Sequence, residues 1–194
     1  MRRARGRLRI IGGRWRGRLL EVPATLVRPT PDRVRETLFN WLAPVIAEAR
    51  CVDAFAGSGA LGLEALSRGA ARALLIEQDA GAAATIERNI ATLQAGGAQL
   101  QRGDARGRLA SVLPGTDLLF LDPPFGGDGL ADLRLACAVP GGPQWVYYEA
   151  AQALAADQLP VGWALWRSGR AGQVQYHLLR RSAAGDATDE GGTA

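Results

Sequence analysis

The sequence contains no lysine, and all 23 of its basic residues are arginine. Coding in a GC-rich genome produces this bias, so the bias assigns no function by itself. The two cysteines, Cys51 and Cys137, lie far apart and form no Cys-x-x-Cys or Cys/His pattern, which argues against a disulfide framework and a thiolate metal site. We expect both to be reduced, buried thiols. The single histidine, His177, cannot form a histidine-rich metal site, so no metal is expected. We expect this residue on the surface of a terminal strand.

Long apolar runs are also missing. No stretch reaches the ~18 apolar residues that a membrane span needs, and the charged N-terminus lacks the apolar core of a secretory signal. We therefore expect a cytoplasmic protein without a membrane partner. With 194 residues, of which 47% are hydrophobic, the chain is long enough to bury one core. A monomer requires no further assumption.

Charge is distributed unevenly along the chain, although the net charge is only +4. Residues 1–18 hold eight arginines and no acid, whereas residues 182–194 hold three acids and no base. The basic segment favours an anionic partner, and the small, polar tail is expected to be disordered. We divide the chain into a basic N-terminal arm with a β-hairpin (1–29), a main domain (30–181) and an acidic tail (182–194).

The main domain shows alternating strand and helix patterns. A hairpin is expected first, from residues 8–11 and 19–22, with Trp15 near its tip. The Thr30 hydroxyl and Pro31 then mark a helix start, as N-cap and first helical residue. Seven strands are expected at 51–55, 73–77, 99–101, 117–121, 145–149, 163–166 and 173–179, with helices at 60–68, 80–93 and 130–138. This order predicts an α/β fold with a mostly parallel seven-stranded sheet, helices on both faces and an antiparallel hairpin at the end.

A glycine-rich turn follows the first strand of the sheet and opens a helix. Residues 57–62, Gly-Ser-Gly-Ala-Leu-Gly, fit the G-x-G-x-x-G pattern, which alone would suggest a dinucleotide. Asp53 favours a different ligand, because a carboxylate at this strand end would face the negative pyrophosphate. S-adenosylmethionine has no phosphate and carries an ammonium and a sulfonium group. A tight turn without any ligand is the alternative.

Acids follow three successive strands, namely Asp53, Glu77 and Asp104. The ligand crevice of an open α/β sheet lies outside these strand ends. Glu77 is placed to accept hydrogen bonds from ribose hydroxyls, and Asp104 from the adenine amino group. For Asp104, a helix N-cap is the competing interpretation. The expected S-adenosylmethionine site consists of Asp53, Phe55, Gly57, Ser58, Gly59, Glu77, Asp104 and Ala105.

The most specific motif is Asp122-Pro123-Pro124-Phe125, directly after the most apolar strand. The Asp122 carboxylate and the Pro123 carbonyl can hold the hydrogens of an exocyclic amine and turn its lone pair toward a methyl donor. Two prolines make the loop rigid, and Phe125 offers a ring on which a flipped-out base stacks. These four residues are the expected catalytic set. A Pro-Pro turn that only ends a strand is the alternative.

Four segments together resemble the bacterial 16S rRNA guanine-N2 methyltransferases of the RsmD type. They are Arg9–Arg18, Arg28–Leu42, Asp53–Gly62 and Asp122–Phe125, and the similarity covers residues 7–181. The resemblance implies a Rossmann-like class I methyltransferase fold, S-adenosylmethionine as cofactor and one guanine N2 of 16S rRNA as target, on the assembled 30S subunit. Arginine stands where that family often has lysine, and the acidic tail has no counterpart.

An RNA substrate also agrees with the arginine-rich segment, which offers salt-sensitive affinity for phosphates. Trp15 is expected either to stack on an unpaired base or to pack back on its hairpin. A capped amphipathic helix accounts for Thr30 and Arg35 nearly as well as a role at the pocket. Tyr147, Tyr148 and Glu149 end a strand at the same sheet edge and could shape the base pocket. The expected RNA-binding residues are Arg9, Arg14, Trp15, Arg16, Arg18, Arg33 and Arg35.

Three other functions agree less well with these residues. An amino-methyltransferase could act instead on DNA adenine N6, on another RNA base or on a protein glutamine, because such enzymes use related tetrapeptides. The DNA and protein enzymes often have Asn first, and the DNA enzymes usually carry an additional recognition domain. A non-catalytic RNA-binding assembly factor would not need Asp53, Glu77 and Asp122 together. An NAD-dependent oxidoreductase is disfavoured by Asp53 and by the lack of an acid/base residue for hydride transfer.

Overall fold

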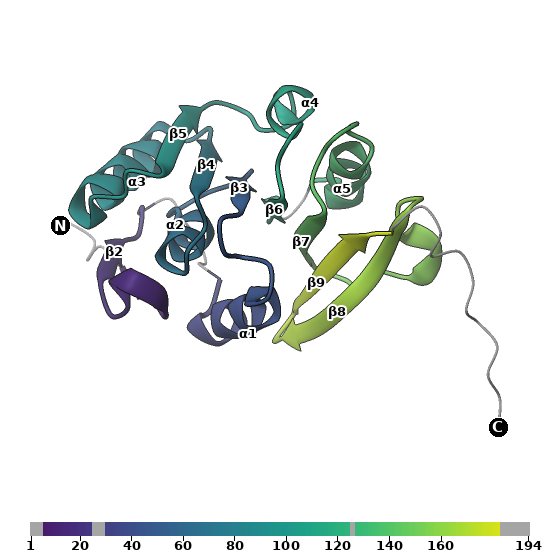
Figure 1. Ribbon diagram of the computed structural model, residues 1–194, viewed down its shortest axis with the longest axis horizontal. Coiled ribbons are helices and arrows are strands. Elements are labelled where there is room, and N and C mark those ends of the chain that lie inside the picture. Colours follow the sequence, from purple (N-terminus) through teal and green to yellow (C-terminus); the bar gives the residue numbers. More distant parts are fainter. Residues whose placement is uncertain (1–5, 25–29, 125–126, 183–194) are drawn as a thin grey trace.

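A computed structural model describes residues 6–24, 30–124 and 127–182 (Figure 1). Its strands form a two-stranded sheet, β1-β2, and a seven-stranded sheet in the order β5-β4-β3-β6-β7-β9-β8. The strands are β1 (Arg7–Arg9), β2 (Leu19–Glu21), β3 (Arg50–Asp53), β4 (Arg72–Glu77), β5 (Ala98–Arg102), β6 (Leu118–Leu121), β7 (Trp145–Ala150), β8 (Trp163–Ala171) and β9 (Val174–Arg181). The helices are α1 (Asp32–Leu42), α2 (Ala60–Ser67), α3 (Ala80–Leu93), α4 (Leu109–Val112) and α5 (Gly129–Cys137), with short 3₁₀ turns η1 (Gly13–Trp15) and η2 (Ala156–Gln158).

The large sheet confirms the predicted fold. Strands β5, β4, β3, β6 and β7 pair in parallel, and only β9 runs antiparallel to both of its neighbours, β7 and β8. The chain builds outward from β3 to β5 and then returns to place β6 on the other side of β3. The strand order therefore reverses between β3 and β6, and ligands of open α/β sheets bind outside the carboxyl ends of the strands at such a reversal.

Helices cover both faces of the sheet. On one face, Cys51, Leu75 and Phe120 pack with α1, α2 and α3, and on the other face, Val52 and Leu119 pack with α4 and α5 (Figure 1). Every residue of β6 is buried, as its unbroken apolar sequence predicts. Both cysteines are free and buried, and burial raises their thiol pKa values to about 12.

The N-terminal hairpin packs into the core of the main domain. Its apolar residues Leu8, Ile10 and Leu20 belong to the same buried cluster as α1 and α2. Trp15 is buried in that cluster and its backbone N–H donates to the Ser67 Oγ of α2, at 3.0 Å. Of the two arrangements predicted for Trp15, the structure therefore shows the one that packs inward, and its predicted place among the RNA-binding residues is wrong.

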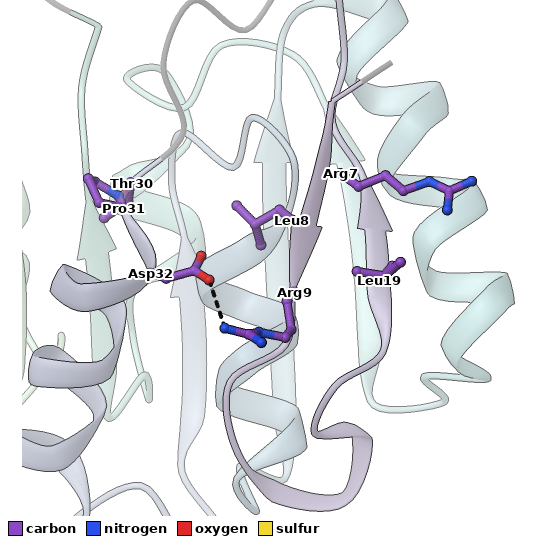
Figure 2. A pocket seen from close by; sticks show the side chains of 7 residues that line it. All are labelled: Arg7, Leu8, Arg9, Leu19, Thr30, Pro31 and Asp32. Atoms are coloured by element: carbon purple, nitrogen blue, oxygen red, sulfur yellow. Dashed lines mark ion pairs between the residues drawn. The ribbon is translucent and has the colours of Figure 1, made fainter. Parts of the chain in front are cut away.

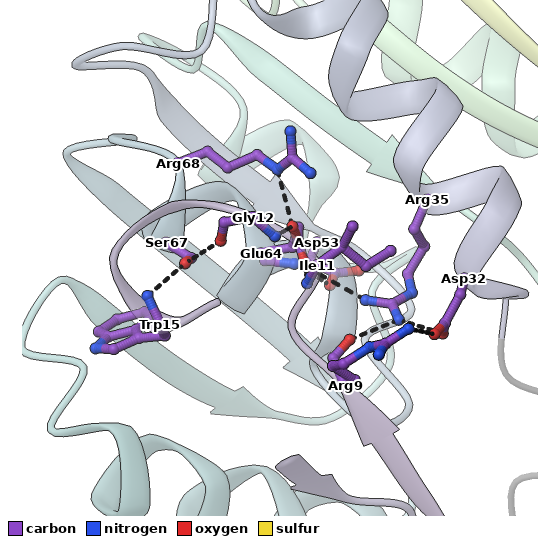
Figure 3. A network of polar contacts seen from close by, with 11 residues as sticks. Arg9, Ile11, Gly12, Trp15, Asp32, Arg35, Asp53, Glu64, Ser67 and Arg68 are labelled. Atoms are coloured by element: carbon purple, nitrogen blue, oxygen red, sulfur yellow. Dashed lines mark hydrogen bonds and ion pairs between the residues drawn. The ribbon is translucent and has the colours of Figure 1, made fainter. Parts of the chain in front are cut away.

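A buried ion network fastens the hairpin to α1 and α2 (Figure 3). The Glu64 carboxylate accepts hydrogen bonds from the backbone N–H groups of Ile11 and Gly12, each at 2.8 Å, and from Arg68 Nε at 2.8 Å. It also pairs with Arg35 at 3.4 Å, and both side chains are fully buried. The bonds from Ile11 and Gly12 join the hairpin to a helix more than 50 residues away in the sequence.

Arg35 belongs to this network rather than to an RNA-binding surface. Its Nη2 donates to the Arg9 carbonyl at 2.8 Å and to the Asp32 carboxylate at 2.7 Å. Its Nε finds no hydrogen-bond partner within the described part of the chain. A guanidinium without exposed surface cannot reach a phosphate, so its predicted RNA-binding role is a second error.

His177 is likewise not on the surface. It lies in β9 at 1% exposure, and its Nε2 accepts a hydrogen bond from the Leu154 backbone N–H at 3.1 Å. Burial lowers its pKa, which favours the neutral ring that this bond requires. The prediction failed because β9, which pairs with both β7 and β8, is an interior strand of the sheet.

Among residues 6–24, 30–124 and 127–182, no helix has the length and apolar character to cross a membrane. Of the predicted tail, residues 182–194, only Ser182 lies within the described residues; residues 1–5, 25–29 and 125–126 also lie outside them.

Candidate active site

Asp53 ends β3 at the point where the strand order reverses. Its side chain is 3% exposed, and Oδ2 accepts a hydrogen bond from the Gly62 backbone N–H at 3.0 Å. A Cβ atom on Gly62 would lie 3.4 Å from Asp53 Oδ2 and 3.2 Å from the Leu75 side chain. The glycine thus lets α2 approach the strand end closely, and the helix presents an N–H group to the carboxylate.

The glycine-rich loop between β3 and α2 is held from two sides. Glu77, at the end of β4, accepts the Gly57 N–H at 2.8 Å through one oxygen and the Asp79 N–H at 2.7 Å through the other. Asn89 of α3 donates to the Ser58 carbonyl at 3.1 Å. Gly57 and Gly59 have φ values of 56° and 77°, which side-chain-bearing residues rarely adopt. The loop is therefore fixed in a shape that its sequence requires.

Asp122 follows β6 and lies beside a second buried acid, Glu149 of β7. The Glu149 Oε1 accepts hydrogen bonds from the Tyr147 hydroxyl at 2.7 Å and the Thr30 hydroxyl at 3.1 Å. Thr30 is thus not the N-cap of α1 as predicted, since Pro31 occupies that position without a side-chain cap. The threonine instead connects the start of α1 to the acid beside the tetrapeptide.

The charges of Asp53, Asp122 and Glu149 act on one another. Burial raises the pKa of Asp53 to about 7, against the hydrogen bond from Gly62, and the charge of Glu77 raises it further. Burial also raises the pKa of Asp122 well above its usual range, and repulsion from Glu149 and Asp53 adds to this effect. The Glu149 pKa is raised by burial although two hydroxyls stabilise its charge. A nearby cation would stabilise the ionised form of these carboxyl groups and so lower their pKa values.

The loop after β5 forms the other end of the site. Asp104 is exposed, and its Oδ1 accepts the Arg106 N–H at 3.1 Å in a local turn. It does not cap α4, because Arg108 holds that position. Ala105 is buried beside it. Arg106 makes two bonds of 2.8 Å to Asp132 of α5, and its guanidinium lies 5.4 Å from the centre of the Phe55 ring.

The remaining predicted residues divide into two groups. Pro123 is buried and Pro124 exposed, whereas Phe125 lies outside the described residues. Five of the predicted RNA-binding arginines are exposed, namely Arg9, Arg14, Arg16, Arg18 and Arg33. Arg14 lies 4.0 Å from the centre of the Trp15 ring, on its solvent side. Most of the positive charge predicted to bind RNA is therefore on the surface.

Sequence reasoning missed three features of this region. It expected Glu149 to help shape the base pocket but did not connect it to Thr30 or to Asp122. The Arg106–Asp132 pair has no sequence signal, because the partners lie 26 residues apart on different elements. Glu64 did have a signal, since it is the only charged residue in a helix that is otherwise apolar or small. Within the described chain, no three His, Cys, Asp or Glu side chains are grouped as metal ligands.

This chain is similar to known proteins over nearly its whole length. Residues 8–180 match the family described as conserved hypothetical protein 95. Ribosomal RNA small subunit methyltransferase D of Escherichia coli K12 is 47% identical over 188 residues, with 93% of each chain covered. The structure of a putative methyltransferase of E. coli matches with a TM-score of 0.83 at 48% identity, covering 92% of this chain and 99% of that one. A putative methylase of Haemophilus influenzae gives 0.72 at 35% identity, covering 92% and 100%.

Proposed function

The chain belongs to the family described as conserved hypothetical protein 95, and we propose that it transfers the methyl group of S-adenosylmethionine to the exocyclic N2 of one guanine in 16S rRNA. The observation that carries this proposal is the group of Asp53, Asp122 and Glu149 at the reversal of strand order. The similarity to a ribosomal RNA small subunit methyltransferase over 93% of each chain supports the substrate. The substrate proposed is the assembled 30S subunit.

The residues at the strand ends fit S-adenosylmethionine. Its charged groups are cationic, and a cation beside Asp53 would stabilise this buried carboxylate, whose pKa burial raises to about 7. Glu77 holds the glycine loop with one hydrogen bond to each oxygen, and each oxygen keeps a lone pair for a ribose hydroxyl. Phe55, Asp104 and Ala105 would hold the adenine, and the bonds from Arg106 to Asp132 keep their loop in place.

The reaction needs an amine held in line with the methyl group. The bound cofactor supplies an electrophilic methyl carbon with a neutral thioether as leaving group. The Asp122 carboxylate and the Pro123 carbonyl accept the two amine hydrogens, which turns the nitrogen lone pair toward that carbon. The methylated nitrogen is acidic and loses its proton readily, so no strong base is required. Glu149 lies beside Asp122 and is itself held in place by hydrogen bonds from Thr30 and Tyr147.

The exposed arginines of the hairpin and of α1 support a polyanionic substrate. Arg9, Arg14, Arg16 and Arg18 lie on one short segment, and Arg33 extends the basic surface to the first turn of α1. Such a surface gives phosphate affinity that falls with salt. It selects no base, so the choice of guanine rests on how the RNA strand enters the site.

Transfer from labelled S-adenosylmethionine to three substrates tests the proposed function. They are 30S subunits from a strain that lacks the endogenous activity, naked rRNA and duplex DNA. We expect label in 16S rRNA of the 30S subunits and none in DNA. Label found only in DNA would contradict the proposal in favour of an adenine-methylating enzyme, and label in none would favour an assembly factor.

A titration of cofactor affinity tests the role of Asp53. A bound cation favours the ionised carboxyl group, so binding releases a proton while the pH is below about 7. Affinity should therefore weaken about tenfold between pH 8 and pH 6. The Asp53→Asn variant should bind weakly at both pH values, with a smaller change between them. Calorimetry at the two pH values measures this, and equal pH dependence in both proteins would exclude Asp53 as a contact.

A further inference from the structure

A cavity of about 360 Å³ opens between the N-terminal hairpin and the start of α1 (Figure 2). It is lined by Arg7, Leu8, Arg9, Leu19, Thr30, Pro31 and Asp32. None of these residues belongs to the carboxylate group or to the glycine loop of the candidate active site. Its volume is within the range of small-ligand sites in proteins.

Hydrogen bonds connect the walls of the cavity to the candidate active site. Thr30 lines the cavity and also donates a hydrogen bond to Glu149, the acid whose charge acts on Asp122. The hairpin, which forms another wall, is joined to the glycine loop by Asn89, whose side chain donates to the Glu21 carbonyl of β2 and to the Ser58 carbonyl, at 3.0 and 3.1 Å. The elements that line the cavity are therefore fixed to both the glycine loop and the acid beside Asp122.

The cavity walls combine positive charge with apolar surface. Arg7 and Arg9 alternate with buried Leu8 and so share the exposed face of β1. Leu19 pairs with Arg9 across the hairpin and is 49% exposed, so it offers apolar surface to the cavity. Pro31 adds a second apolar surface. A nucleotide matches this combination, with a phosphate for the arginines and a base or sugar for the apolar groups.

The acids near these arginines are already paired. Asp32 bonds to buried Arg35 at 2.7 Å and faces Arg9 at 3.6 Å, so two cations share its charge. Glu21, also near the hairpin face, pairs with Arg88 at 3.0 Å. The wall thus stays positive overall, which favours an anion.

We propose that this cavity binds a nucleotide adjacent to the methylated guanine in the RNA strand, with its phosphate at Arg7 and Arg9 and its base or sugar against Leu19 and Pro31. This inference rests on the proposed function. The protein would thus select its target guanine by binding a second nucleotide in the cavity while the guanine amine lies at Asp122.

Two matched pairs of variants test the cavity. Arg7→Gln/Arg9→Gln removes its positive charge, and Arg72→Gln removes an exposed arginine at the amino end of β4 that does not line the cavity. Leu19→Glu places an acid in the cavity, and Leu135→Glu places one on α5, where the leucine is 46% exposed. For each variant, KM for 30S subunits, its dependence on salt, kcat and the Kd for S-adenosylmethionine are measured.

For the double arginine variant we expect KM to rise about tenfold and the slope of log KM against log salt to fall by one to two. Leu19→Glu should raise KM similarly, while kcat and the cofactor Kd stay within about twofold of wild type, and both controls behave as wild type. If KM changes no more than in the controls, or if the cofactor Kd weakens instead, the cavity does not bind RNA. If the wild-type protein transfers no methyl group to 30S subunits, the proposed function fails and this inference fails with it.

Discussion

Replacement of Asp122 by alanine should reduce methyl transfer about 10³-fold, because the amine loses an acceptor that orients its lone pair. Cofactor affinity should change little, since Asp53 and the glycine loop remain in place. The loss should appear in kcat rather than in KM for RNA, because the carboxylate acts on the reacting nitrogen and not on the phosphates. Single-turnover transfer with saturating 30S subunits measures the effect, and calorimetry measures the cofactor Kd.

Two further variants make this result specific. Asp122→Asn keeps one oxygen acceptor in the same place and should retain more activity than Asp122→Ala. Asp157→Ala removes an exposed carboxylate in η2, an element that supplies none of the candidate site residues, and should be as active as wild type. Full activity of Asp122→Ala would show that the amine is held by other groups.

Replacement of Glu64 by alanine should lower the free energy of unfolding by about 3–5 kcal/mol, the range measured when one partner of a buried ion pair is removed. The change leaves the N–H groups of Ile11 and Gly12 without acceptors and leaves the buried charge of Arg35 with only Asp32 as an acidic partner. Urea unfolding followed by circular dichroism measures it. The hairpin should also become more open to proteolysis, because Glu64 is its main polar attachment.

Glu87→Ala is the matched control for this prediction. Glu87 pairs with Arg102 on the surface, with both side chains more than half exposed, and such pairs contribute at most about 1 kcal/mol. Equal destabilisation of the two variants would mean that the buried network does not hold the hairpin.

Much of the sheet and the glycine loop could be predicted because their signals are local. The helix 80–93 has the predicted limits, and β6 is buried as its apolar sequence indicates. In β8, by contrast, the strand continues to Ala171 instead of ending near Trp166. Its residues after Trp163 are mostly exposed, so they lack the apolar alternation on which the prediction depends.

The errors share one physical cause, which is contact between residues far apart in sequence. Thr30 and Glu149 are 119 positions apart, and neither residue type indicates the other. Arg35 and Arg33 look alike in an arginine-rich helix, yet one is buried and the other exposed. Composition predicts only that an arginine binds an anion. The packing of the hairpin shows that Arg35 pairs with the carboxylates of Glu64 and Asp32.

The identity of the methylated atom tests the account most directly. 16S rRNA from 30S subunits treated with the protein and labelled cofactor is digested to nucleosides and analysed by mass spectrometry. The account predicts a single new product, N2-methylguanosine, that is absent when Asp122→Ala replaces the wild-type protein. A methylated adenosine, or N2-methylguanosine formed equally by Asp122→Ala, would contradict it.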